Sequence, residues 1–218
     1  MDENQTLNEK QQSIIPIAAF TANGNLESLK AALNDGLNAG LTVNEVKEIL
    51  VHLYAYTGFP FSLNGINTFI AVMEERKAQG IVDEVGPEAS PIPDNLNKDE
   101  YGTKVRSKLA GWETIPPAGG YQLFAPVIDT FLKEHLFADI FARDVLDFQT
   151  RELVTVSALA SMKGTAGQLF FHLGAAMNTG FSEAQMKEFI SVLETNVDQK
   201  VADNAKNVLV MVLKSKEK

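Results

Sequence analysis

The segments NAGLTVNE (38–45) and NTGFSEAQ (178–185) lie 140 residues apart and share one pattern. In each, an Asn-x-Gly triplet is followed by an apolar residue and then by a hydroxyl residue, Thr42 or Ser182. Glycine favours the left-handed backbone that ends a helix. A hydroxyl residue with Glu or Gln three residues later forms the capping box that begins one. Each segment therefore predicts a tight corner between two helices.

The similarity extends beyond these corners. Residues 24–50 and 164–190 share seven identities in 27 positions when the chain is shifted by 140. Two amphipathic helix pairs with common cap residues would explain part of this similarity, but the shared frame favours a true duplication. Apolar residues follow both capping boxes at the three- and four-residue spacing of a buried helix stripe: Val46, Ile49, Leu50 and Leu53 in one copy, and Met186, Phe189, Ile190 and Leu193 in the other.

The rest of the chain is also predicted to be mainly helical. Strand signals are scarce, because no long alternation of polar and apolar residues occurs. Helices are expected over 7–22, 61–79, 98–110, 123–142, 148–162 and 197–213. We therefore predict an all-α fold, a tandem duplication of a multi-helix repeat. The first repeat is expected over 1–80, a linker and short helical insert over 81–120, and the second repeat over 121–218.

Composition excludes several classes of function. The net charge of −9 argues against a nucleic-acid partner, which usually needs a basic surface. The chain has no cysteine, so it cannot form a disulfide, a thiolate metal site or a thiol redox relay by itself. No apolar run reaches the roughly 18–20 residues of a membrane span. The polar start, MDENQTLNEK, does not resemble a signal peptide, and a cytoplasmic protein without a membrane partner is expected.

Several motifs resemble the carboxymuconolactone decarboxylase family. They are RELVTVSALA (151–160) and HLGAAMNTG (172–180) in the second copy, LNAGLT (37–42) and YTGFP (56–60) in the first, and FLKEHLFADIF (131–141) between them. The resemblance implies an all-helical fold of the alkylhydroperoxidase D type. It also implies that single-copy members assemble as rings. A two-copy chain is therefore expected to form a homo-oligomer, a trimer that mimics a six-copy ring.

The family that the chain resembles also contains the alkylhydroperoxidase D proteins. These use a Glu, a Cys-x-x-Cys pair and a His as a thiol and proton relay. In this chain Thr165 and Gln168 stand where that motif places its cysteines. Neither residue forms the thiolate that attacks a peroxide, so a peroxidase function is disfavoured.

Two residues of the second copy are candidates for acid–base chemistry. His172 is one candidate, because an unperturbed histidine side chain has a pKa near 6.5, which suits a general acid or base, although a buried packing histidine would show the same pattern. Glu152 stands in the first turn of an expected helix, where the helix dipole alone favours an acid. The resemblance implies that Glu152 orients His172. Beside it, Arg151 is a candidate for binding a substrate carboxylate, or for a structural salt bridge.

The first copy lacks this pair. Ala32 aligns with His172, and Ser13 or Gln12 aligns with Glu152, depending on the position of a one-residue gap. Two matching positions in a duplicated chain have therefore diverged in chemistry.

The first copy carries different candidates, His52 and Tyr56, which are four residues apart and so share one helix face. The second copy has Val192 and Asn196 at the aligned positions. Each copy therefore lacks the candidate residues that the other carries. These complementary losses suggest one composite pocket built from both copies, although drift in a structural protein would also produce them. The third histidine, His135, is expected on a helix surface.

The resulting functional hypothesis is a cofactor-free lyase acting on a small carboxylated lactone or unsaturated acid. His172 would donate the proton, Glu152 would orient it, and His52 or Tyr56 would stabilise the developing oxyanion. Cations are expected at the pocket mouth, with Arg151, Lys163 and Arg106 as candidates. The alternative is a catalytically idle or ligand-binding protein. No metal-ligand spacing, phosphate loop or dinucleotide motif is present, so neither a metal nor a cofactor is expected.

Overall fold

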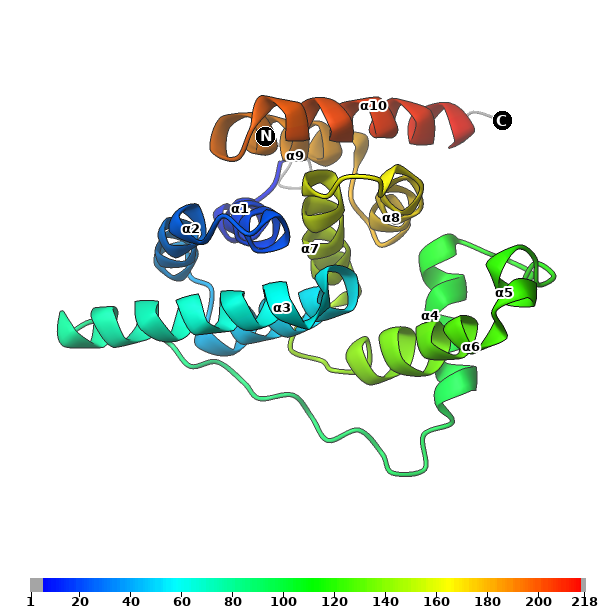
Figure 1. Cartoon of the computed structure of the whole chain (residues 1–218), viewed down its shortest axis with the longest axis horizontal. Coiled ribbons are helices and arrows are strands. Elements are labelled where there is room, and N and C mark those ends of the chain that lie inside the picture. The colour runs from blue at the N-terminus through cyan, green and yellow to red at the C-terminus, as the bar shows by residue number, and fades with distance from the viewer. Residues whose placement is uncertain (1–5, 217–218) are drawn as a thin grey trace.

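The computed structural model describes residues 6–216, and every regular element among them is a helix (Figure 1). This confirms the predicted all-α fold. The elements are α1 Glu9–Asn23, α2 Leu26–Asn38, α3 Val43–Ala78, α4 Lys98–Ala110, α5 Tyr121–Phe124, α6 Pro126–Thr130, the π-helix η1 Phe131–Ile140, α7 Phe148–Ser161, α8 Ala166–Asn178, α9 Glu183–Asn196 and α10 Gln199–Lys216. None of these helices is both long enough and apolar enough to span a membrane.

The helix boundaries repeat with the spacing seen in the sequence. Helices α2 and α8 begin and end 140 residues apart, and α3 and α9 also begin 140 residues apart. Both predicted capping boxes are present, with Thr42 and Ser182 as the N-caps of α3 and α9. The glycines that precede them have positive φ angles, 92° at Gly40 and 119° at Gly180. The duplication is therefore visible in structure as well as in sequence.

Helix α3 corresponds to α9 and α10 together, because a kink at Gly58 divides it. Gly58 has φ 78° and ψ 166°, a backbone region that is essentially restricted to glycine. Pro60 then occupies the start of the second half, where its missing N–H costs nothing. The kink turns the second half of α3 back along the first, where the Ser62 hydroxyl donates to the carbonyl oxygen of Leu50 and Phe69 and Val72 join the core. It also fixes where the side chains just before it, including Tyr56, point.

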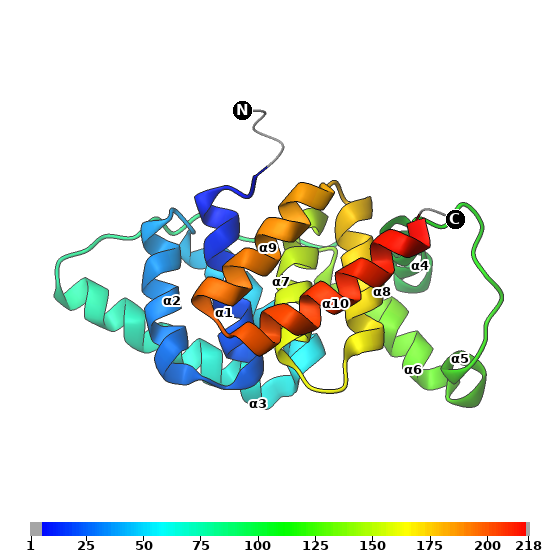
Figure 2. The ribbon, with the colours of Figure 1, turned by 90° about the horizontal axis from the view of Figure 1, so that it is seen from above.

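One large hydrophobic core joins the two repeats. Helices α1 and α7, the first helix of each repeat, pack against each other at its centre (Figure 2). Several of their side chains are completely buried, among them Ile15, Ile17, Leu153 and Val156. The neighbouring helices close the core around them.

The insert forms a second, smaller core. Helix α4 crosses η1 so closely that a Cβ on Gly102 would collide with the carbonyl oxygen of Lys133. Val105 and Leu109 pack there on Leu136 and Phe137. The predicted helix over 123–142 is instead divided into α5, α6 and η1, with Pro126 in the first turn of α6. Since α4 packs on η1, the insert reaches structurally beyond residue 120; the domain boundaries themselves stay predictions.

Candidate functional site

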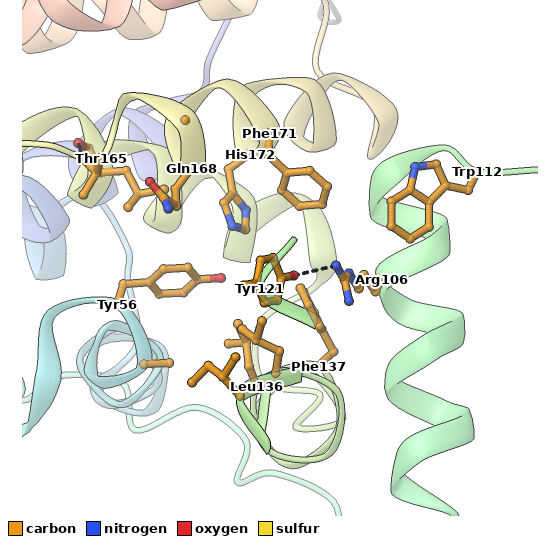
Figure 3. Close-up of a pocket in the computed structure, with 15 residues that line it drawn as sticks. Tyr56, Arg106, Trp112, Tyr121, Leu136, Phe137, Thr165, Gln168, Phe171 and His172 are labelled. Carbon is orange, nitrogen blue, oxygen red and sulfur yellow. Dashed lines mark hydrogen bonds between the residues drawn. The ribbon is translucent and has the colours of Figure 1, made fainter. Parts of the chain in front are cut away.

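A cavity of about 710 Å³ lies where the two repeats meet the insert (Figure 3). Most of its wall is apolar or aromatic, with a few polar groups among the lining side chains, which is the usual character of a small-molecule site. The lining residues are Ala55, Tyr56, Arg106, Trp112, Tyr121, Ile128, Leu132, Leu136, Phe137, Leu159, Thr165, Gly167, Gln168, Phe171 and His172.

His172 and Glu152 form a buried pair at this cavity. Helix α8 carries His172 and helix α7 carries Glu152, and the two side chains are 7% and 0% exposed. Nδ1 of His172 lies 2.7 Å from Oε2 of Glu152. Because a carboxylate only accepts hydrogen bonds, Nδ1 carries the proton in this bond. Nε2 has no hydrogen-bond partner among residues 6–216, and the ring points into the cavity (Figure 3). The histidine can therefore exchange a proton with a ligand at Nε2.

Tyr56 reaches the same point from the first repeat. Its ring meets that of His172 edge to face, with centroids 5.4 Å apart. Its hydroxyl is buried and has no hydrogen-bond partner among the described residues, and the same is true of Oε1 of Glu152. Burial, reinforced by the negative charge of Glu152, raises the pKa of Tyr56 far above its ordinary value. Tyr56 therefore remains a neutral O–H donor at physiological pH.

His52 lies behind Tyr56 and does not line the cavity. Its Nε2 is 2.8 Å from the hydroxyl of Thr155, whose own proton is donated to the carbonyl oxygen of Arg151. Nε2 therefore carries the proton of the neutral ring, and Nδ1 accepts from Arg151 at 3.2 Å. Burial, followed by the charge of Arg151, holds the pKa of His52 well below its ordinary value.

This arrangement removes His52 from the groups that could touch a substrate. Its ring packs on that of Tyr56 with centroids 5.3 Å apart. We therefore interpret His52 as a positioning residue for Tyr56, in place of the catalytic role expected from the sequence.

Arg151 is completely buried and also lies away from the cavity. Besides His52, its guanidinium donates to Oε1 of Glu48 at 2.7 Å and to the carbonyl oxygen of Arg143 at 2.6 Å. Glu48 is 2% exposed and is also bonded by Arg143 at 2.9 Å. Arg151 therefore makes the structural salt bridge that the sequence left open, and it does not have the predicted substrate-binding position.

The cavity is composite in the way that the complementary losses suggested. Tyr56 of the first repeat meets His172 of the second at the cavity, as Figure 3 shows, and Glu152 of the second repeat is bonded to His172 behind it. A reciprocal pocket of about 370 Å³ is lined by Ser13 and Ala32 of the first repeat and by Asn196 of the second. Ala32 and Asn196 align with His172 and Tyr56, and Ser13 or the neighbouring Gln12, which also lines this pocket, aligns with Glu152. The duplication is therefore visible in two related pockets, and the His–Glu pair is present at only one of them.

The structure also places the remaining candidates. Arg106 lines the cavity, whereas Lys163 is exposed and does not. His135 lies outside it, where Nε2 accepts from the hydroxyl of Tyr54 at 2.7 Å and joins η1 to α3. Among the described residues, no group of three or more acidic or histidine side chains is arranged to hold a metal ion.

The insert supplies an aromatic wall that could not be predicted from the sequence. Trp112 follows α4 and Tyr121 begins α5. Neither has a counterpart in the aligned segments, so the internal comparison could not select them. Their only signal was their aromatic character in a segment otherwise rich in Pro and Gly. Phe137 of η1 lies inside the family-like motif 131–141, which gave no indication that its ring would line a cavity.

A family comparison agrees with this geometry. The sequence model of the carboxymuconolactone decarboxylase family matches residues 1–67 and 126–210. The chain belongs to this family. The two matched segments contain Tyr56, Glu152 and His172, while Arg106, Trp112 and Tyr121 fall between them. No curated protein matches the sequence. The family match thus covers most of the two predicted repeats and leaves out residues 68–125, which include α4 and α5.

Proposed function

We propose that this carboxymuconolactone decarboxylase family member is a cofactor-free lyase that removes carbon dioxide from a small carboxylated lactone or a related unsaturated acid. The observation that carries the proposal is the His172–Glu152 pair, whose free Nε2 faces a largely apolar cavity. An imidazole oriented by a buried carboxylate is an established arrangement for general acid–base catalysis.

The reaction divides into two events. The bond from the reacting carbon to the carboxylate breaks, carbon dioxide leaves, and the electron pair is delocalised onto a neighbouring oxygen as a dienolate. Nε2 of His172 takes up a proton from solvent, and the resulting imidazolium gives that proton to carbon. Glu152 stabilises the imidazolium and fixes its orientation. The hydroxyl of Tyr56, which has no partner among residues 6–216, is available to donate to the developing oxyanion.

A thiol peroxidase is not proposed, because the chain contains no cysteine. Thr165 and Gln168 both line the cavity, and neither supplies a thiolate. The homotrimer and the cytoplasmic location stay predictions.

The test is turnover of 4-carboxymuconolactone, followed by ultraviolet absorbance, in the wild type and Tyr56→Phe. We expect Tyr56→Phe to lower kcat by roughly 10²–10³-fold, the usual effect of removing one oxyanion donor. Its free energy of unfolding should not fall, since the hydroxyl makes no hydrogen bond in the described chain.

Tyr54→Phe is the matched control. The Tyr54 hydroxyl is bonded to His135 outside the cavity, so its loss should cost about 0.5–1.5 kcal/mol of stability and leave kcat unchanged. Equal kcat values for wild type and Tyr56→Phe would remove Tyr56 from the mechanism. A wild type that is inert toward this lactone and toward related unsaturated acids would favour the ligand-binding alternative.

A further inference from the structure

The insert lines one end of the cavity with one cationic and two aromatic side chains. Helix α4 contributes Arg106, the loop after it contributes Trp112, and α5 contributes Tyr121. Figure 3 shows Arg106 and Trp112 on the side opposite Tyr56, with Tyr121 between the two sides. All three insert residues lie between the segments matched by the family.

Arg106 is the only lysine or arginine among the lining residues of the cavity. Its NH1 donates to Oδ1 of Asp129 and its NH2 to the hydroxyl of Tyr121, both at 2.8 Å. The guanidinium carbon also lies 5.5 Å from the centroid of the Trp112 ring. A guanidinium has five N–H groups, so three remain without a partner among the described residues. Arg106 is thus held in place and still able to bind a ligand.

Asp129 contacts other side chains besides Arg106. The same carboxylate accepts from Nε2 of Gln122 at 2.9 Å, and its second oxygen lies 3.9 Å from Nζ of Lys133. Lys133 pairs more closely with Asp99, so Arg106 and Gln122 are the main partners of this carboxylate. Arg106 keeps the fork of donors that matches a carboxylate, at a cavity wall that is only partly exposed to water.

The size and lining of the cavity indicate the rest of the ligand. A volume of about 710 Å³ lies within the roughly 300–1,000 Å³ that encloses drug-sized molecules. A single-ring lactone in contact with His172 would leave the Arg106 end unfilled. Aromatic side chains cover the distance between the two ends: Tyr56, Trp112, Tyr121, Phe137 and Phe171. Such walls favour a flat, apolar body.

We propose that the insert forms a carboxylate subsite, and that the site takes, besides the small lactone used as a test substrate, an extended aromatic or polyunsaturated acid. A carboxylate that does not react binds Arg106 beside Trp112, the apolar body lies along the aromatic walls, and the reacting end meets His172. The placement of the reacting end rests on the proposed function, whereas the carboxylate subsite can be tested by binding alone.

The chain contains a single tryptophan, Trp112, so its fluorescence reports directly on occupancy of this end of the cavity. The probes are 4-phenylbutyrate and its neutral amide, 4-phenylbutyramide, which differ only in the group that Arg106 would bind. We expect the wild type to bind the acid at least about tenfold more tightly than the amide, as charge-assisted hydrogen bonds allow.

Arg106→Gln should remove this preference for the acid and leave amide binding nearly unchanged. Lys104→Gln is the matched control, because Lys104 is exposed on the same helix and pairs with Glu100 away from the cavity. It should keep the preference. Equal affinity for acid and amide in the wild type, an equal loss of both in Arg106→Gln, or no saturable change in emission would each overturn the subsite.

Arg106→Gln also breaks the contact between α4 and α6, so Asp129→Asn provides a second test. It keeps Arg106 and removes the competing carboxylate. Acid binding should tighten several-fold if Arg106 is a ligand-binding group. A purely structural ion pair predicts no tightening, and that result would contradict the proposal.

Different experimental results would contradict the carboxylate subsite and the proposed lyase function. His172→Ala should retain the preference for the acid, because the Arg106 end is untouched. An acid preference that depends on Arg106, in a protein without turnover, would support the subsite and reject the lyase. Turnover without that preference would reject the subsite and leave the lyase standing.

Discussion

Glu152→Gln is expected to lower kcat for decarboxylation by roughly 10²–10⁴-fold, the range measured for acid–base groups and their orienting carboxylates. Oε2 of Glu152 accepts the Nδ1 proton of His172 at 2.7 Å. The amide of glutamine carries no charge to stabilise the imidazolium. It can also rotate to donate to Nδ1, which would move the proton of the neutral ring to Nε2.

The same substitution should leave the fold intact. Glu152 is completely buried, and its Oε1 has no partner among residues 6–216. Replacing a buried charge by a neutral amide reduces the cost of desolvation. The measurement is kcat together with the melting temperature. Gln168→Ala is the control, because it alters the cavity wall outside the pair and should change kcat less than tenfold. Wild-type kcat in Glu152→Gln would contradict the assigned role.

Glu48→Gln is expected to lower the free energy of unfolding by about 3–5 kcal/mol, the typical cost of leaving a buried charge unpaired. Arg151 is 0% exposed, and Glu48 is the only carboxylate to which it is bonded in the described chain. The converse change is less severe. In Arg151→Met, Glu48 keeps its ion pair with Arg143 at 2.9 Å.

Urea unfolding of both variants tests this order. Lys187→Met is a matched control, because Lys187 forms an exposed pair with Glu183 that should contribute little. Glu48→Gln should shift the midpoint the most, Arg151→Met less, and Lys187→Met hardly at all. A larger loss in Arg151→Met than in Glu48→Gln would show that the network is not organised around the buried cation.

The helices and their repeat could be predicted because short-range signals define them. The capping boxes at Thr42 and Ser182 satisfy free N–H groups within three residues. Gly40 and Gly180 supply the positive φ that the corners need. The helix expected over 98–110 matches α4 at both ends. The π-helix η1 was not predicted, because its geometry depends on packing against α4 and not on a local sequence signal.

Family resemblance and duplication together selected Glu152, His172 and Tyr56, whose catalytic roles stay predictions. The structure brings His172 and Tyr56 together at one cavity, with Glu152 buried behind His172 and bonded to it. It separates Arg151 and His52 from that cavity, although Arg151 is adjacent to Glu152 and His52 lies four residues from Tyr56. On a helix, adjacent residues face different directions, so Glu152 meets His172 while Arg151 faces Glu48. Composition alone could not distinguish these two faces.

The most direct test of the account is turnover of 4-carboxymuconolactone by the wild type and by His172→Ala, measured side by side. We predict turnover in the wild type and a loss of at least about 10²-fold in the variant, because Nε2 of His172 is the proton donor. Equal turnover in both proteins would contradict the assignment of His172. Absence of turnover in the wild type would reject this lactone as the substrate.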